Sequence, residues 1–357
     1  MRKTAAKLLA AAALATSVVT VASGTAVADP STLPTLPLAQ DIVGVGSDTT
    51  QAVLNGLSAG YNASLPVGST LPRLYSWDAT GSSTIVTKTG AITTPAFNRP
   101  NGSGAGITAL NNTTSTTVDF ARSSRGPQTG DPATDIFVTL GKDAVSWAAK
   151  SGGNAPSNLT TAQLKGIYEC TITNWTQISA SLPNATIKPF LPQTNSGTRS
   201  FFLKAIGGAT AVVPGTCVTA NPLVQENQGT DPVLNDVNAV VPYSVAHYIG
   251  QVFNGHASGS DAQGPLTIRD INSIAPVSTA TPKVINSSFA ATAYGRVIYN
   301  VVREAEWTAT DAHGTALRAI FGVGGWICTT NGAGSAIIKD HGFLALPNGA
   351  CGSTTHA

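Results

Sequence analysis

Residues 187–206, IKPFLPQTNSGTRSFFLKAI, hold the strongest pattern in the chain. An apolar, strand-like run leads into Asn-Ser-Gly-Thr and then into a helical pattern. In this order, the first free N–H groups of the helix point beyond the end of the strand. The N-terminus of a helix carries a charge of roughly +0.5, which favours an anion. Ser196 and Thr198 add hydroxyl donors, and Gly197 allows close approach of the backbone. Arg199 adds a fixed cation, so this segment predicts a site for a small oxyanion.

The same order of residues occurs twice more. Residues 42–54, IVGVGSDTTQAVL, and residues 101–110, NGSGAGITAL, each place Ser, Thr or Gly at the start of a helical pattern. Any one of them is more often an ordinary capped helix, because Ser, Thr, Asp and Asn are the usual N-caps. Three such starts in one chain favour an oxyanion site.

The first 28 residues predict a cleaved signal peptide. Arg2, Lys3 and Lys7 precede an apolar stretch over residues 8–22, and Ala-Val-Ala at residues 26–28 is a small-residue cleavage site. The apolar stretch is too short and too interrupted for a good membrane span. Cleavage after Ala28 and the lack of a nearby cysteine predict a secreted, extracellular protein without a lipid anchor.

Composition excludes several classes of protein. The signal segment contains three of the 20 basic residues and none of the 18 acidic ones, so the rest of the chain has 17 basic and 18 acidic residues. This near-neutral balance shows no basic stripe for nucleic acid and no polybasic patch for a membrane surface. Charged residues make up 11%, well below the roughly 25% of typical domains, while 42% apolar content argues against disorder. The remaining chain is long enough for two domains.

Four cysteines in an exported chain predict two disulfides. Three pairings are possible, and Cys170–Cys217 with Cys328–Cys351 closes the shortest loops. A zinc site is the weaker interpretation because no two cysteines have the C-x-x-C spacing. The five histidines are scattered, so we expect neither a metal nor a cofactor.

From residue 41 onward, short apolar runs alternate with helical patterns, which is typical of an α/β fold. Residues 29–40 are Pro-rich and predict an extended leader. Strands are predicted over residues 117–121, 135–140 and 237–241, and helices over residues 160–168, 244–253, 291–302 and 311–321.

Several blocks, in order, resemble one family. They are GVGSDT (44–49), NGSGAGI (101–107), VDFA (118–121), LKGIY (164–168), ITNW (172–175) and SGT (196–198), with looser matches at ENQGT (226–230) and RVIY (296–299). The chain resembles type II periplasmic-binding-type proteins, close to the phosphate-binding subunits of phosphate ABC importers.

This resemblance implies two α/β domains joined by two crossover strands, with a ligand in the cleft between them. Domain I would comprise residues 41–143 and 243–357, and domain II residues 144–242. In the family the equivalent loops hold phosphate. Carried over to this chain, the ligand-binding residues are Asp48, Thr49, Ser103, Ser196, Gly197 and Thr198.

Two positions depart from the family pattern. The family has an Asp shortly after the Val-Asp-Phe strand, where this chain has Ser124, and an Arg before Ser-Gly-Thr, where this chain has LPQTN (191–195). Arg199, Arg122 or Arg125 would have to replace that cation. Without the Asp, which accepts the proton of hydrogen phosphate and repels sulfate, we expect only a weak preference for phosphate over sulfate.

The predicted function is therefore a secreted solute-binding protein for a small oxyanion, with phosphate first. We expect a monomer without catalytic activity and an ABC transporter permease as its partner. Neither Gly-x-Ser-x-Gly nor His-Glu-x-x-His occurs, which makes a phosphate-ester hydrolase the least favoured class. A secreted surface or adhesion protein that reuses the fold without a ligand is the main alternative.

Overall fold

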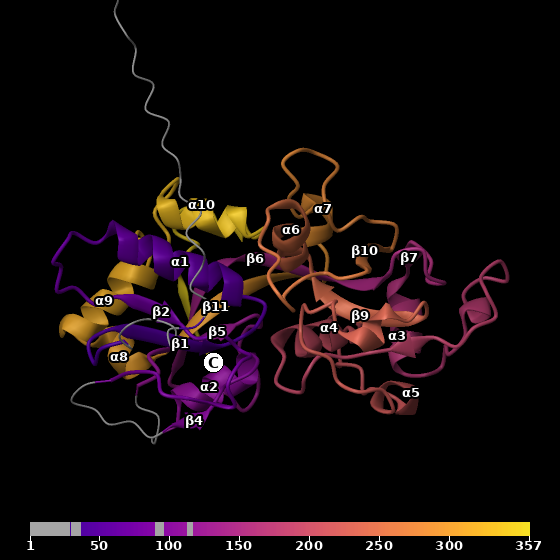
Figure 1. The fold of residues 1–357 in the computed structure, drawn as a ribbon, viewed down its shortest axis with the longest axis horizontal. Helices are drawn as coiled ribbons and strands as arrows, with labels where there is room; N and C mark the ends of the chain where they lie inside the picture. The colour runs from indigo at the N-terminus through magenta and orange to yellow at the C-terminus, as the bar shows by residue number, and fades with distance from the viewer. Residues whose placement is uncertain (1–28, 30–36, 90–95, 113–116) are drawn as a thin grey trace, which may run out of the picture.

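The computed structural model describes residue 29 and residues 37–89, 96–112 and 117–357. The predicted signal peptide and most of the predicted leader lie outside the described residues. Figure 1 shows an α/β protein with two lobes side by side, which confirms the predicted fold class. In the described part of the chain, no helix has the length and apolar character needed to cross a membrane.

Lobe I is built on a mixed sheet. Strand β1 (Ile42–Gly46) pairs in parallel with β2 (Leu74–Ser76) on one side and β5 (Phe120–Ser123) on the other. Every residue of β1 is buried, as expected for a parallel strand that is covered on both faces. The antiparallel strand β11 (Gly295–Arg303) pairs with β5 and continues the sheet.

Strand β6 (Asp135–Lys150) runs through both lobes. Its first part pairs with β11 and with the short strands β12 (Leu344–Ala345) and β13 (Thr354–His356). Its last residues pair with β9 (Ala239–Ser244) and β10 (Leu266–Ile271), which belong to lobe II. A single 16-residue strand thus carries the chain from one lobe to the other.

Lobe II completes its sheet with β7 (Asn158–Leu159) beside β10 and β8 (Lys188–Pro189) beside β9. The predicted division assigned residues 243–357 to domain I. This division stays a prediction. Strand β10, which lies within the range 243–357, pairs with residues 147–150 of β6 and with β7.

The helices cover the faces of the two sheets (Figure 1). Those of lobe I are α1 (Gln51–Ser64), α2 (Ser103–Leu110), α8 (Glu304–Thr308), α9 (Ala312–Phe321) and α10 (Ala333–Asp340). The others are α3 (Thr161–Tyr168), α4 (Gly197–Gly207), α5 (Thr216–Thr219), α6 (Val245–Phe253) and α7 (Ser287–Ala290). Strands β3 (Thr84–Ile85) and β4 (Phe97–Asn98) form a separate pair.

Most predicted elements are confirmed, and one is wrong. Helices α3, α6 and α9 lie where the sequence predicts them, and the Thr160 side chain caps α3. Residues 291–302, predicted as a helix, instead lead into strand β11. Buried Arg296, Ile298 and Asn300 alternate there with half-buried Val297 and Tyr299, which is the period of two of a strand.

Both predicted disulfides are present. Cys170 is joined to Cys217 in lobe II, and Cys328 to Cys351 in lobe I. All four cysteines are therefore paired, which removes the zinc interpretation of these residues.

Candidate functional site

The starts of helices α2 and α4 meet between the lobes. Gly102 has a φ of 102°, and a Cβ at this position would lie 2.4 Å from the carbonyl oxygen of Asn195 in lobe II. The N–H of Gly104 donates to the same oxygen at 3.1 Å. Glycine at position 102 therefore lets the two lobes touch directly.

A second glycine brings two hydroxyls to the start of α4. A Cβ on Gly197 would lie 2.4 Å from the Oγ atoms of both Ser103 and Ser124. The N–H of Ser124 donates to Ser103 Oγ at 3.0 Å, and the two Oγ atoms are 3.3 Å apart. Three residues that the sequence predicts for the site are thus gathered from α2, the end of β5 and α4.

The starts of α1 and α4 meet through two threonines and a glutamate. Thr49 Oγ1 lies 3.0 Å from Thr198 Oγ1, and both hydroxyls donate to Oε1 of Glu226. Glu226 is fully buried, and its Oε2 has no hydrogen-bond partner among the described residues. A carboxylate oxygen from lobe II is therefore held by one hydroxyl from each lobe.

Neighbouring donors orient these two hydroxyls. Arg296 Nη2 donates to Thr198 Oγ1 at 2.9 Å, and the Asn227 side-chain amide donates to Thr49 Oγ1 at 3.2 Å. A hydroxyl carries only one proton, so each threonine accepts from its neighbour and directs its own proton at Glu226. The cluster is a polarised donor set aimed at an oxyanion.

Arg296 is anchored at the junction of the lobes. Its Nε and Nη2 atoms donate to Asp143 Oδ2 at 2.9 and 2.7 Å. Asp143 also accepts from the hydroxyl of Ser244 and from the backbone N–H of Ala246 at the start of α6. Arg296 is 4% exposed, and its Nη1 has no hydrogen-bond partner in the described part of the chain.

A polar seam surrounds the cluster. Asp48 accepts from the side-chain amides of Gln225 at 2.9 Å and Asn227 at 3.4 Å. Gln225 also bonds Asn101, which in turn accepts from Gln193 at 2.7 Å. These contacts join lobe I residues to lobe II residues, so the two lobes touch around the cluster.

A charged group lies behind Thr49. His247 donates from Nδ1 to the Thr49 carbonyl and from Nε2 to Asp261, at 3.1 and 2.6 Å. Burial alone would lower the pKa of His247, but Asp261 outweighs it and raises this pKa to about 10. Burial, followed by the charges of Asp261 and Glu226, raises the pKa of Asp48 to about 8. At neutral pH the imidazole is charged and Asp48 is protonated.

Some predicted site residues have other partners. Arg125 forms an ion pair with Asp131, with Nη1 to Oδ2 at 2.6 Å, and Arg199 donates to the carbonyl of Pro192. Ser196 accepts from the N–H of Arg199 and so caps its own helix. Arg122 is fully buried and donates to the carbonyls of Ser47, Trp77 and Gly46 and to the Ser76 hydroxyl.

Sequence reasoning missed three residues of the site, namely Glu226, Arg296 and Asp143. Glu226 and Arg296 stood only in the looser blocks of the family resemblance, and no role was assigned to them. One signal was available, because Arg296 and Asp143 interrupt apolar, strand-forming runs. A buried charge inside a strand needs a partner of opposite sign, and these two residues are partners of each other.

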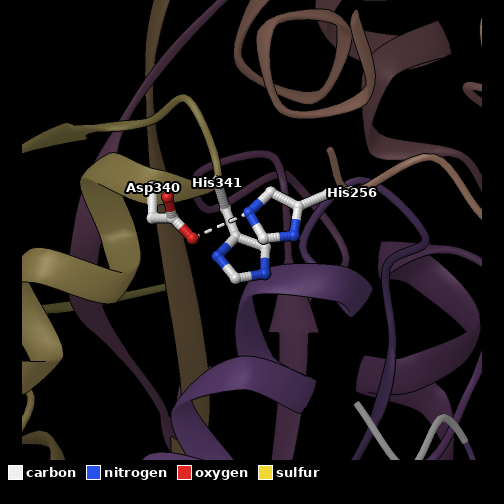
Figure 2. Close-up of side chains that lie close together, drawn as sticks. All are labelled: His256, Asp340 and His341. Atoms are coloured by element: carbon white, nitrogen blue, oxygen red, sulfur yellow. Dashed lines mark hydrogen bonds and ion pairs between the residues drawn. The ribbon is translucent and has the colours of Figure 1, made fainter. Parts of the chain in front are cut away.

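A cluster of titratable side chains lies outside the cleft, at the ends of α6 and α10 (Figure 2). The rings of His256 and His341 stack with centroids 3.8 Å apart, and His256 pairs with Asp340 at 2.9 Å. His341 Nδ1 donates to the Ile337 carbonyl, and burial lowers the pKa of His341 to about 4. The stacked rings and the His256–Asp340 pair link the ends of the two helices.

Comparison with known proteins gives a consistent result. A family model described as "PBP superfamily domain" matches residues 44–316. No curated protein matches the sequence. Among solved structures, an ABC-type phosphate transport receptor from Vibrio cholerae is similar at 18% identity and a TM-score of 0.54, covering 86% of this chain and 100% of that one.

Two further structures have the same fold. A putative phosphate ABC transporter substrate-binding protein from Clostridium perfringens, solved with bound phosphate, has 14% identity and a TM-score of 0.58, covering 86% of this chain and 100% of that one. A phosphate-binding protein from Stenotrophomonas maltophilia has 14% identity and a TM-score of 0.51, covering 87% of this chain and 91% of that one. With a family model matched over most of its length and this two-lobed architecture, the chain belongs to the PBP superfamily.

Proposed function

We propose that this chain is an extracellular solute-binding protein that holds a small oxyanion between its two lobes, with phosphate as the favoured candidate. The observation that carries the proposal is the contact between Glu226 and the two threonines. A carboxylate is itself an oxyanion, and Thr49 and Thr198 already donate to one of its oxygens from opposite lobes. The same donors are suited to an oxygen of phosphate.

Further donors lie around this position. Ser103 and Ser124 stand against Gly197, and the buried Nη1 of Arg296 is without a partner among the described residues. Phosphate is also the solute for which the similar proteins from Vibrio cholerae and Clostridium perfringens are named. In this role the protein would deliver its anion to the permease of an ABC transporter.

Calorimetric titration of dialysed protein with phosphate at pH 7 tests the proposal, with chloride as the control anion. We expect saturable binding to one site and a rise in melting temperature with phosphate concentration. The double variant Thr49→Val and Thr198→Val should fold and show neither effect. Absence of binding by the unmodified protein would favour a surface or adhesion role instead.

The same preparation separates binding from catalysis. A hydrolase would release chromophore from a chromogenic phosphate ester, whereas a binding protein leaves the ester intact. We expect no turnover above that of the double threonine variant.

A further inference from the structure

Glu226 occupies the place where the donors of both lobes converge. Its Oε1 accepts from Thr49 and Thr198, and its backbone N–H donates to Gln193 Oε1 at 3.0 Å. On either side, Gln225 and Asn227 contact Asp48 across the cleft. Residues 225–227 thus form a strap from lobe II that reaches lobe I, with the carboxylate of Glu226 at its centre.

We propose that Glu226 is an internal anion that competes with the solute for the hydroxyls of Thr49 and Thr198. This inference rests on the proposed function, because it concerns the regulation of the same site. A hydroxyl has one proton to donate, so neither threonine can donate to an external oxyanion while it donates to Glu226. The solute therefore binds only when the Glu226 side chain leaves.

The bonding of Glu226 fits a displaceable group. Its Oε2 is buried without a hydrogen-bond partner in the described residues, so the carboxylate is only half satisfied. An unpaired buried oxygen has a desolvation cost that it recovers on moving into water. The cost of breaking its two bonds to threonine is thereby partly offset.

Competition is tested with Glu226→Ala, which removes the internal anion. We expect it to bind phosphate and sulfate at least tenfold more tightly than the unmodified protein, about 1.4 kcal/mol. Glu169→Ala is the matched control, because it removes a negative charge from an exposed position of lobe II. Its affinity for both anions should equal that of the unmodified protein.

A second measurement needs no phosphate. Acetate carries the carboxylate that Glu226→Ala lacks, so it should raise the melting temperature of this variant in a dose-dependent manner. The unmodified protein and Glu169→Ala should not respond. If Glu226→Ala does not fold, Glu226→Gln keeps the shape without the charge and should still bind both anions more tightly than the unmodified protein.

The outcomes separate the two proposals. Weaker or unchanged phosphate binding by the Glu226 variants would overturn the competition, because Glu226 would then support the bound anion. A lack of response of Glu226→Ala to acetate would overturn it as well. If acetate stabilises Glu226→Ala but no variant binds phosphate or sulfate, the internal anion stands and the phosphate proposal fails.

Discussion

Two fully buried carboxylates lie on either side of Arg296 and Thr198, and they are bonded very differently. Asp143, at the junction of the lobes, accepts hydrogen bonds on both oxygens from Arg296, Ser244 and Ala246. Glu226, in the cleft, accepts on one oxygen only. The difference indicates that the junction is a fixed structural centre, whereas the cleft holds a group that can be exchanged.

The largest effect is expected at the junction. Asp143→Asn leaves the buried guanidinium of Arg296 without its counter-charge, which costs about 3–5 kcal/mol of unfolding free energy for a buried pair. Glu226→Gln should change this free energy by less than about 1 kcal/mol, because one carboxylate oxygen is already unsatisfied. Urea denaturation measures the free energy of unfolding of both variants. Equal losses would indicate that Asp143 and Glu226 contribute equally to stability, against the difference inferred from their bonding.

The charges behind the cleft predict that stability falls as the pH rises. The pKa of Asp48 is raised to about 8, so between about pH 4 and pH 8 this carboxyl ionises in the unfolded chain but not in the folded one, and stability falls as the pH rises. The pKa of His247 is raised to about 10, so its contribution is complete below about pH 6.5 and is lost as the pH rises toward 10. Asp261, with a lowered pKa, acts in the opposite direction only in acid.

Urea midpoints between pH 5 and pH 9 measure this trend. Asp48→Asn mimics the protonated carboxyl and should flatten the curve below pH 8, while the loss caused by His247 remains above pH 7. A stability that rises from pH 7 to pH 9 in the unmodified protein would contradict the assignment, because the lowered pKa of His341 affects stability only below about pH 6.5.

Within the cleft, the two predicted donors of α4 should differ. Thr198→Ala removes a donor to a charged ligand, which is worth about 1.5–3 kcal/mol or roughly 10- to 150-fold in phosphate affinity. Arg199→Ala should stay within about threefold because Arg199 bonds the Pro192 carbonyl, although the sequence placed this cation at the site. Titration calorimetry measures the phosphate affinity of both variants. Equal losses of affinity would indicate that Arg199 also contacts the bound anion.

The smallest expected effect concerns selectivity. A Ser hydroxyl can donate or accept, so Ser124 does not repel sulfate as an Asp would, and the preference for phosphate should stay within about tenfold. Ser124→Asp should sharpen this preference. If a thousandfold excess of sulfate fails to displace phosphate from the unmodified protein, a carboxylate such as Glu226 remains in contact with the bound anion.

Local patterns in the sequence predicted much of this fold. The start of α4 was recognised because its Ser cap, Gly and Thr are consecutive. The mistaken helix at residues 291–302 contains apolar residues that fit both a helical and a strand period. Only pairing with β5 and β6 decides the outcome, and these partners lie far away in the sequence.

The composition of the site was less accessible for a related reason. Glu226 lies 177 residues from Thr49, and their contact exists only because the lobes close. Arg125 and Arg199 are predicted cations by their position in the sequence, and in the structure Arg125 pairs with Asp131 while Arg199 Nη1 donates to the Pro192 carbonyl. Sequence proximity to a loop does not determine where a long side chain finds its partner.

A crystal structure of the protein grown with phosphate would show directly which group the two threonines contact. We expect an anion that accepts hydrogen bonds from the hydroxyls of Thr49 and Thr198, with the Glu226 side chain turned away from both. Phosphate bound elsewhere, or bound while Glu226 still accepts from both threonines, would contradict it.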